Sequence, residues 1–231
     1  MDHPHKGFET VTCVLQGAIA YEDFTGNKGI LGIGDVQWMT AGRGIIHTEM
    51  AGGDGTNTAV QVWINLSSQQ KMIEPRCNDV RSKDIPAVKQ DGVEARILAG
   101  EAFGVNSPIY NNTQIMFLDF TLMPRAQLHQ HIPESWNSFV YVIEGEGTFG
   151  SLSSPPIKSH TLLVLGHGDG LCVWNNTPKP LRFLLMAGKP LSEPVVHCGP
   201  FVMNTQSEID NTLQDYRQFK NGFEMGKHWR C

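Results

Sequence analysis

Two pairs of side chains that can bind a metal ion constrain this chain more than any other feature of its sequence. The first pair is His3 and His5, on either side of Pro4, and the second pair is His47 and Glu49. Residues two apart on a β-strand point to the same face of the sheet. Two such strands facing each other across a small barrel would bring three imidazoles and one carboxylate to a single point. The spacing therefore predicts β-strands at both positions and a metal site between them.

The composition favours a globular protein built from strands. Of the 231 residues, 40% are hydrophobic and 18% are charged, and the 24 glycines and 13 prolines are scattered between short apolar runs. Frequent turns of this kind are typical of an all-β protein. The length allows one large domain or two small ones.

Charge and cysteine content argue against several classes of function. The formal net charge is −5 and the basic residues are dispersed, so direct binding to nucleic acid is not expected. No apolar run approaches the roughly 20 residues of a membrane helix, and no membrane partner is expected. The cysteines are odd in number and never form a C-x-x-C pair, so we interpret them as small buried residues without a catalytic role. They are Cys13, Cys77, Cys172, Cys198 and Cys231.

Short apolar or alternating runs between turns predict the strands. The predicted strands cover residues 7–15, 18–24, 30–33, 36–39, 45–50 and 59–66 in the first half, and 93–98, 116–122, 138–143, 161–165, 171–174 and 181–186 in the second. The stretch 67–92 has weaker periodicity and contains two prolines. We interpret it as the connection between two units.

A faint internal repeat supports two copies of one unit. The Gly-Asp turn at Gly34 returns at Gly168, and the His-x-His pattern returns at His129 and His131. In the second copy no histidine follows the Gly-Asp turn, so only half of the ligand set is repeated. The second unit is therefore expected to hold no metal, with His129 and His131 as exposed or packing residues.

The C-terminal tail is the one segment with a helical pattern. Thr205 and Glu208 have the spacing of a capping box. Apolar residues then follow at helical spacing on one face, and they are Ile209, Leu213, Tyr216 and Phe219. The pattern predicts a helix over residues 207–219, which must dock on a barrel because a single short helix is not stable alone.

Three segments together resemble the pirin family within the cupin superfamily. They are DHPHKGFETV at residues 2–11, GDVQWMTAGRGI at 34–45 and GPFVMNT at 199–205. The resemblance implies a bicupin, meaning two tandem antiparallel β-barrels of the jelly-roll type, with the C-terminal helix packing back on the first barrel. The implied segments are an N-terminal barrel at 1–88, a C-terminal barrel at 89–200 and a tail at 201–231. Pirins normally carry a further segment before the His-Pro-His motif, so the first strands of the N-terminal barrel are expected to be missing here.

The same resemblance implies one iron ion, Fe(2+) or Fe(3+), in the N-terminal barrel, held by His3, His5, His47 and Glu49. The donor types agree, because imidazoles suit iron, copper, zinc and nickel, whereas an added carboxylate favours iron or manganese. Glu9 completes the spacing His-x-His-x-x-x-Glu, a cupin motif whose glutamate often binds the metal. We favour Glu49 as the ligand and Glu9 as a partner of the ligands or a general base, on the face of the strand that carries His5.

The family resemblance implies two activities that share one site. Pirins are described as nuclear coregulators that act with NF-kappa-B-type transcription factors according to the iron oxidation state, and many show quercetin 2,3-dioxygenase activity. We therefore expect a monomer in nucleus and cytoplasm, with a flavonol such as quercetin and O₂ as reactants if the chain is an enzyme. The alternative is a metal-poor structural or protein-interaction cupin without catalysis.

Four further residues near the motifs are compatible with either a structural or a binding role. Phe8, Trp38 and Trp63 are interpreted as core residues rather than as platforms for a substrate. Arg43 lies in a glycine-rich turn close to the ligands. It fits either a residue that steers an anionic substrate or a structural surface arginine.

Overall fold

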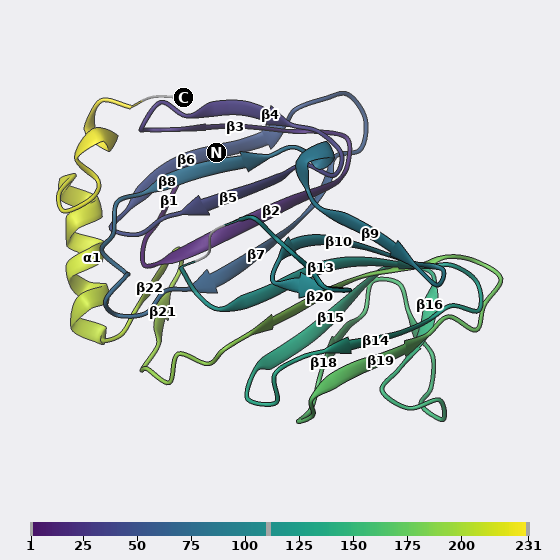
Figure 1. Ribbon diagram of the computed structural model, residues 1–231. Helices are drawn as coiled ribbons and strands as arrows, with labels where there is room; N and C mark the ends of the chain where they lie inside the picture. The colour runs from purple at the N-terminus through teal and green to yellow at the C-terminus, as the bar shows by residue number, and fades with distance from the viewer. Residues whose placement is uncertain (1, 110–111, 230–231) are drawn as a thin grey trace. The chain divides into compact units, whose positions relative to one another are not determined.

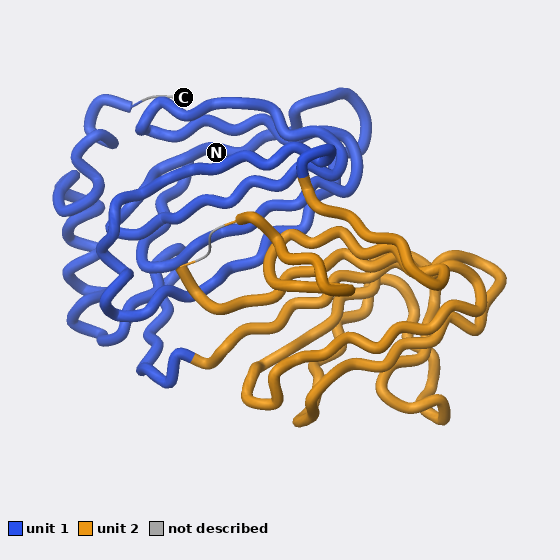
Figure 2. The backbone as a smooth tube through the Cα atoms, in the orientation of Figure 1, with its two compact units in different colours: residues 1–84, 191–231 blue, residues 85–190 orange. Residues whose placement is uncertain are grey.

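Antiparallel strands form nearly all of the regular structure in the computed structural model, which describes residues 2–109 and 112–229 (Figure 1). The chain divides into two compact units, coloured separately in Figure 2. The first unit consists of residues 1–84 and 191–231, and the second consists of residues 85–190. The all-β, two-unit fold expected from the sequence is confirmed.

The unit boundaries differ from the predicted segments 1–88, 89–200 and 201–231 at two places. β9 (Ala87–Gln90) pairs with β10 (Val93–Ala99), so the second unit begins earlier than predicted. β21 (Val196–Cys198) pairs with β22 (Phe201–Met203), so residues 191–200 stay with the first unit. Strand pairing between short segments sets both boundaries, and composition does not reveal it.

Two four-stranded antiparallel sheets build the first unit. Their orders are β1-β6-β3-β4 and β7-β2-β5-β8. The strands are β1 (His3–His5), β2 (Phe8–Gln16), β3 (Ile19–Asp23), β4 (Lys28–Leu31), β5 (Val36–Thr40), β6 (Ile45–Ala51), β7 (Thr58–Asn65) and β8 (Arg76–Val80), followed by a 3-10 turn at Ser82–Asp84.

The stretch 67–92, interpreted as a connection, contains β8 and β9. β8 is an edge strand that pairs with β5, and its sequence is mostly polar. An edge strand with polar side chains lacks the apolar alternation that marks a strand in the sequence, so periodicity does not predict β8.

The second unit has a six-stranded sheet, a four-stranded sheet and a small hairpin. The orders are β18-β15-β20-β13-β10-β9, β14-β19-β16-β17 and β11-β12. Besides β9 and β10, the strands are β11 (Glu101–Ala102), β12 (Val105–Asn106), β13 (Ile115–Leu122), β14 (Gln127–His131), β15 (Asn137–Glu144), β16 (Glu146–Phe149), β17 (Ile157–Lys158), β18 (Leu162–Val164), β19 (Gly170–Trp174) and β20 (Leu181–Gly188). Residues from both large sheets fill one apolar core, among them Ile97, Phe120, Val140, Val173 and Phe183.

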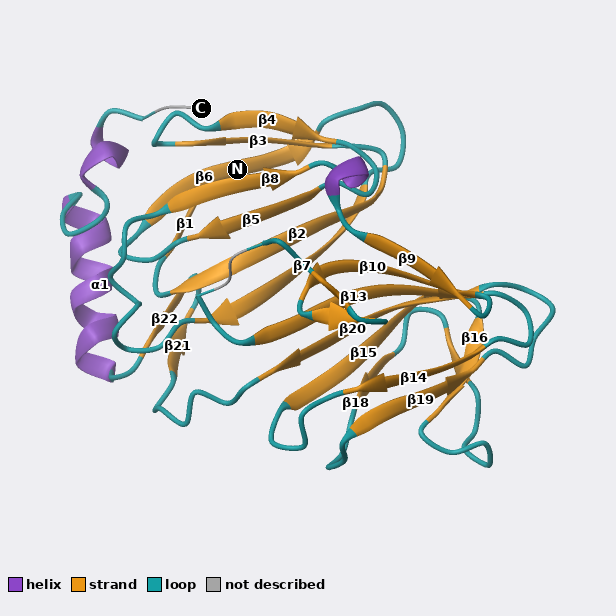
Figure 3. Ribbon diagram, viewed as in Figure 1, coloured by secondary structure: helices purple, strands orange, loops and turns teal. Residues whose placement is uncertain are grey.

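The C-terminal helix α1 (Gln206–Gln218) packs on the first unit beside β21 and β22 (Figures 1 and 3). Its N-cap is Thr205, and both hydrogen bonds of the capping box with Glu208 are present. Ile209 is fully buried in a cluster that also contains Ile45 and Phe201. The predicted helix and its docking on the first barrel are confirmed. A 3-10 helix at Glu224–Lys227 follows.

Candidate metal centre

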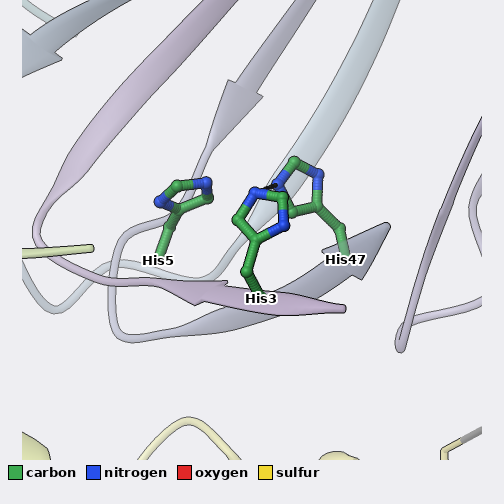
Figure 4. A group of neighbouring side chains, drawn as sticks. All are labelled: His3, His5 and His47. Atoms are coloured by element: carbon green, nitrogen blue, oxygen red, sulfur yellow. Dashed lines mark hydrogen bonds between the residues drawn. The ribbon is translucent and has the colours of Figure 1, made fainter. Parts of the chain in front are cut away.

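His3, His5 and His47 come together because β1 and β6 are neighbours in one sheet. The antiparallel register places His3 opposite His47, and His5 opposite Ile45. Opposite residues in an antiparallel pair, and residues two apart on one strand, share a face. The three imidazoles therefore point toward one another from two strands (Figure 4). The sequence predicted strands facing each other across a barrel, whereas the structure places them side by side.

The distances between the ring nitrogens are close to those that one shared metal ion requires. One nitrogen from each ring lies within 4.8 Å of the others, and the Nε2 atoms of His3 and His47 are 2.8 Å apart. Two nitrogens bound to one ion at about 2.1 Å, at right angles, lie about 3.0 Å apart. Both ring nitrogens of His5 are buried, and neither has a hydrogen-bond partner of good geometry among the described residues. A metal ion would satisfy one of them.

The environment keeps the buried imidazoles neutral, which is the form that binds a metal. Burial, with a smaller effect of the neighbouring His3, lowers the pKa of His5 from 6.5 to about 3, and the backbone of Pro200 opposes this shift. Burial and the neighbouring His5 and His3 lower the pKa of His47 to about 3 as well. No proton therefore has to leave either ring at neutral pH before a cation binds.

Glu49 lies next to the three-histidine cluster but is not a member of it. Its Oε2 atom is 3.9 Å from Nε2 of His47. Ligands of one ion are separated by about 3.0 Å when adjacent and by about 4.2 Å when opposite, for metal–ligand distances near 2.1 Å. The carboxylate is thus within the range that coordination beside His47 requires. Its role as the fourth ligand stays a prediction.

Glu9 is fully buried, and its side chain lies on the face of β2 that is opposite to the one near Glu49. Its Oε1 accepts a hydrogen bond of 2.6 Å from the Thr40 hydroxyl, which also accepts one from Arg76. Thr12, three residues later on β2, faces Glu49 instead, and alternation puts Glu9 on the opposite face. The expectation that Glu9 shares a face with His5 assumed an unbroken strand, but Gly7, at φ +88°, interrupts it. A catalytic role for Glu9 stays a prediction.

Three residues that the sequence did not mark as site residues contact the predicted ligands. Gln61 and Thr12 hydrogen-bond Glu49. The Trp63 ring packs edge-on against His5, with centroids 5.4 Å apart, and against Phe8 at 4.4 Å. Trp63 is 43% exposed. One sequence signal could have revealed these residues. Gln61 and Trp63 are two positions apart on one predicted strand, so a polar side chain and an aromatic one share a face of it.

The other aromatic residues and Arg43 have structural roles. Phe8 and Trp38 are buried in the core, as predicted. Arg43 forms ion pairs with Glu74 at 3.2 Å and with Glu224 at 3.1 Å. Of the two roles considered, these contacts favour the structural one, because they tie the glycine-rich turn to the C-terminal segment.

The C-terminal segment fixes the strand that carries two of the ligands. Lys6 forms a parallel bridge with Phe201, and its buried ammonium group donates to the Asn221 carbonyl at 3.1 Å. Lys71, also buried, donates to the carbonyls of Gly7 at 2.8 Å and Val202 at 2.9 Å. Residues more than a hundred positions away in the sequence therefore hold β1 in place.

In the second unit, His129 and His131 are exposed on β14, where their register partners are Cys172 and Gly170. They belong to no group of clustered ligands among the residues that the structure describes. Cys13, Cys77, Cys172 and Cys198 form no disulfide among the described residues, and Cys231 lies outside them. Cys13 is buried as expected, whereas Cys198 is exposed. None of the described helices is long and apolar enough to span a membrane.

Two antiparallel barrel units and a histidine cluster in the first of them define a bicupin, and comparison with known proteins agrees. The model of the pirin family matches residues 1–64, and that of the pirin C-terminal cupin domain matches residues 117–222. A pirin-like protein of Solanum lycopersicum is 57% identical over 228 residues, covering 99% of this chain and 78% of the relative. Human pirin is 46% identical over 231 residues, covering 99% of this chain and 80% of human pirin. The chain belongs to the pirin family.

Solved structures show the same fold. A quercetin 2,3-dioxygenase from Acinetobacter baumannii superposes with a TM-score of 0.88 at 32% identity, covering 96% of this chain and 79% of that one. A bacterial pirin from Escherichia coli, solved in complex with nickel(II), superposes with a TM-score of 0.66 at 22% identity, covering 82% and 76%. At 22% identity, the similarity to the Escherichia coli protein supports the fold alone.

Proposed function

We propose that this chain binds one iron ion through His3, His5 and His47, with Glu49 as the fourth ligand, and that the loaded site oxidises a flavonol such as quercetin with O₂. The observation that carries the proposal is the cluster of three imidazoles, each with a nitrogen within 4.8 Å of the others. Burial keeps two of them, His5 and His47, neutral. The likeness to a quercetin 2,3-dioxygenase, at 32% identity over almost the whole chain, supports the choice of substrate.

The chemistry of the donors supports iron over the other metals that imidazoles bind. A carboxylate added to histidines favours iron or manganese. A bound iron ion would supply open coordination positions and redox chemistry for the flavonol and O₂. The residues of this chain would bind the ion with neutral rings, keep His5 and His47 away from water, and orient the Glu49 carboxylate.

The test is an anaerobic titration of the iron-loaded protein with quercetin, followed by addition of air. We expect a change in the iron absorption spectrum on binding, then loss of the flavonol and appearance of its ring-opened product. The His47→Ala variant should do neither, and His129→Ala should match the wild type. An iron spectrum that quercetin leaves unchanged would contradict the enzymatic proposal.

A second candidate function uses the same iron as a redox switch. We propose that the protein also acts in nucleus and cytoplasm as a monomeric coregulator that binds NF-kappa-B-type transcription factors through its surface. Membership in the pirin family supports this, and the net charge of −5 argues for protein rather than DNA contacts. The addition of one charge on oxidation inside a buried site would shift the contacts around it.

The switch is tested by measuring binding of a Rel-family protein to the ferrous and ferric forms. A difference of about tenfold, absent in His47→Ala, is the expected result, since couplings between sites are typically 5–150-fold. Equal binding by both forms would contradict the switch. If the purified protein takes up no stoichiometric metal, a structural cupin without catalysis becomes the better description.

A further inference from the structure

We infer that Gln61, held in one orientation by the Trp63 indole, is the positioning residue that sets the Glu49 carboxylate beside the three-histidine cluster. The inference rests on the proposed metal binding and assigns a role to two residues outside the ligand set. Neither residue would touch the metal itself. Each would act through the ligands that it contacts.

The geometry starts from β7, where Gln61 and Trp63 are two residues apart and therefore share a face. The register with β2 places Gln61 opposite Thr12. From there the Gln61 Nε2 atom reaches Oε1 of Glu49 at 3.2 Å and Oε2 at 3.1 Å, and it also donates to the Thr12 hydroxyl at 3.0 Å. The Thr12 hydroxyl in turn lies 3.4 Å from Oε1 of Glu49. One amide thus contacts both oxygens of the carboxylate.

The orientation of the amide is fixed by Trp63. The indole Nε1–H can only donate, and it points at Oε1 of Gln61 over 3.1 Å. A reversed amide would place its NH₂ group against the indole N–H and its oxygen against the carboxylate. Both ends would then repel their partners, so the observed orientation is the only one that satisfies the whole chain of bonds.

The hydrogen bonds from Gln61 and Thr12 hold the Glu49 carboxylate in one orientation. Thr12 contacts Oε1 and Oε2 is the atom that faces Nε2 of His47 at 3.9 Å. Charge-assisted bonds from Gln61 restrict rotation, so less side-chain freedom is lost when Glu49 binds a cation. The Trp63 ring also packs on His5. A single half-exposed side chain therefore supports two of the residues proposed to hold the metal.

The test compares metal binding by two variants that remove one hydrogen-bonding group each. Gln61→Met removes the amide, and Trp63→Phe keeps an aromatic ring on His5 while removing the N–H. Co(II), whose visible spectrum reports coordination number, is the probe, with Fe(II) measured anaerobically beside it. We expect about tenfold weaker binding and a changed Co(II) spectrum for Gln61→Met, in line with the 10–100-fold cost of losing groups that support metal ligands. Trp63→Phe should give a smaller change of the same kind.

Two controls show whether the effect of Gln61→Met passes through Glu49. Gln69→Met, at an exposed turn position, should bind Co(II) as the wild type does. In a Glu49→Ala background, Gln61→Met should cause no further loss, because its effect passes through Glu49. Full additivity of the two substitutions would overturn the inference, as would an unchanged affinity and spectrum in Gln61→Met.

A metal-free readout separates this inference from the proposed function. The indole N–H resonance of Trp63 in the apo protein should shift in Gln61→Met and in Glu49→Ala, and stay in place in Gln69→Met. If the resonance shifts in neither, the chain of bonds is absent and the inference fails. If it shifts as expected but the wild type binds neither Co(II) nor Fe(II), the proposed function fails and the positioning of Glu49 for a metal fails with it. Binding by the wild type with an unchanged Gln61→Met overturns the inference alone.

Discussion

The Nε2 atoms of His3 and His47 lie 2.8 Å apart across the β1–β6 register. In the metal-free protein this distance allows one hydrogen bond, with a proton on one ring and a lone pair on the other. With a cation bound, the same two atoms can occupy adjacent coordination positions with almost no movement. The pairing of two strands thus builds most of the site before any metal arrives, which is the preorganisation that tight binding needs.

His47→Ala is expected to abolish stoichiometric metal. His47 is 1% exposed and contributes one of the three imidazoles, so its truncation removes a proposed ligand and leaves a buried cavity. We expect affinity for Fe(II) to fall by more than about 100-fold, beyond the cost of losing a group that merely supports a ligand. Metal content after dialysis measures it. His129→Ala, an exposed histidine of the second unit, is the matched control and should retain the metal. Equal losses in both variants would contradict the site.

The metal-free protein should lose stability as the pH falls below 6.5. His5 and His47 have a pKa of about 3 when folded and 6.5 as the ordinary value, so the unfolded chain binds more protons between these limits. Stability therefore rises with pH across that window and is lost on acidification. At pH 5.5 each histidine costs about 1.4 kcal/mol relative to pH 7.5 or above, since one pKa unit corresponds to about 1.4 kcal/mol. Urea unfolding at both pH values measures the difference.

The control for this pH effect is a variant that removes one of the two buried groups. His5→Leu should show about half of the pH dependence of the wild type between pH 7.5 and 5.5. If it shows the full dependence, other groups are responsible and the buried imidazoles titrate normally.

Sequence alone predicted that His3, His5 and His47 lie together on strands, because residues two apart on a strand point to the same face. It could not predict which strands are neighbours. The register that pairs His3 with His47 is a long-range contact, and local periodicity carries no information about it. For this reason the histidine strands were predicted on opposite walls of the barrel rather than side by side.

Glu9 and Gln61 show two further limits of local reasoning. Alternation along one regular strand predicts that Glu9 and His5 share a face. Gly7, which has a positive φ, interrupts the strand between them, so the alternation does not continue from His5 to Glu9. Gln61 carries no motif, and its importance comes only from the position of Glu49 on another strand. The helix, in contrast, was predicted within one residue at each end because its capping box and apolar stripe are local signals.

Gly7→Ala should destabilise the first unit and weaken metal binding. A Cβ added at Gly7 would collide with the Val202 carbonyl oxygen, and φ is +88°. We expect a loss of about 2–5 kcal/mol, from roughly 1–2 kcal/mol of left-handed strain and about 1–3 kcal/mol of overpacking. Denaturant unfolding and Fe(II) affinity both report it, because the β1–β2 junction must move.

Gly26→Ala separates these two causes. Gly26 has nearly the same φ, +93°, but nothing lies within 4 Å of an added Cβ. This variant should lose only the backbone term of about 1–2 kcal/mol and keep its metal. Equal destabilisation at the two positions would show that the close approach of Val202 to Gly7 contributes nothing to the loss of stability.

Lys71→Met should loosen the attachment of the C-terminal hairpin to the ligand strand. Burial lowers the pKa of Lys71 to about 8, so most of the group is still protonated at pH 7, and it donates to Gly7, Val202 and Asn65. Methionine fills a similar space but leaves these acceptors without their donor, which costs about 2 kcal/mol or more. Lys89→Met is the matched control, because Lys89 forms an exposed ion pair with Glu94, and its loss should change stability by no more than about 1 kcal/mol. Denaturant unfolding of both variants, with amide hydrogen exchange at β1 and β22, measures the effect. Exchange that speeds up at β22 but not at β1 would mean that the hairpin does not hold the ligand strand.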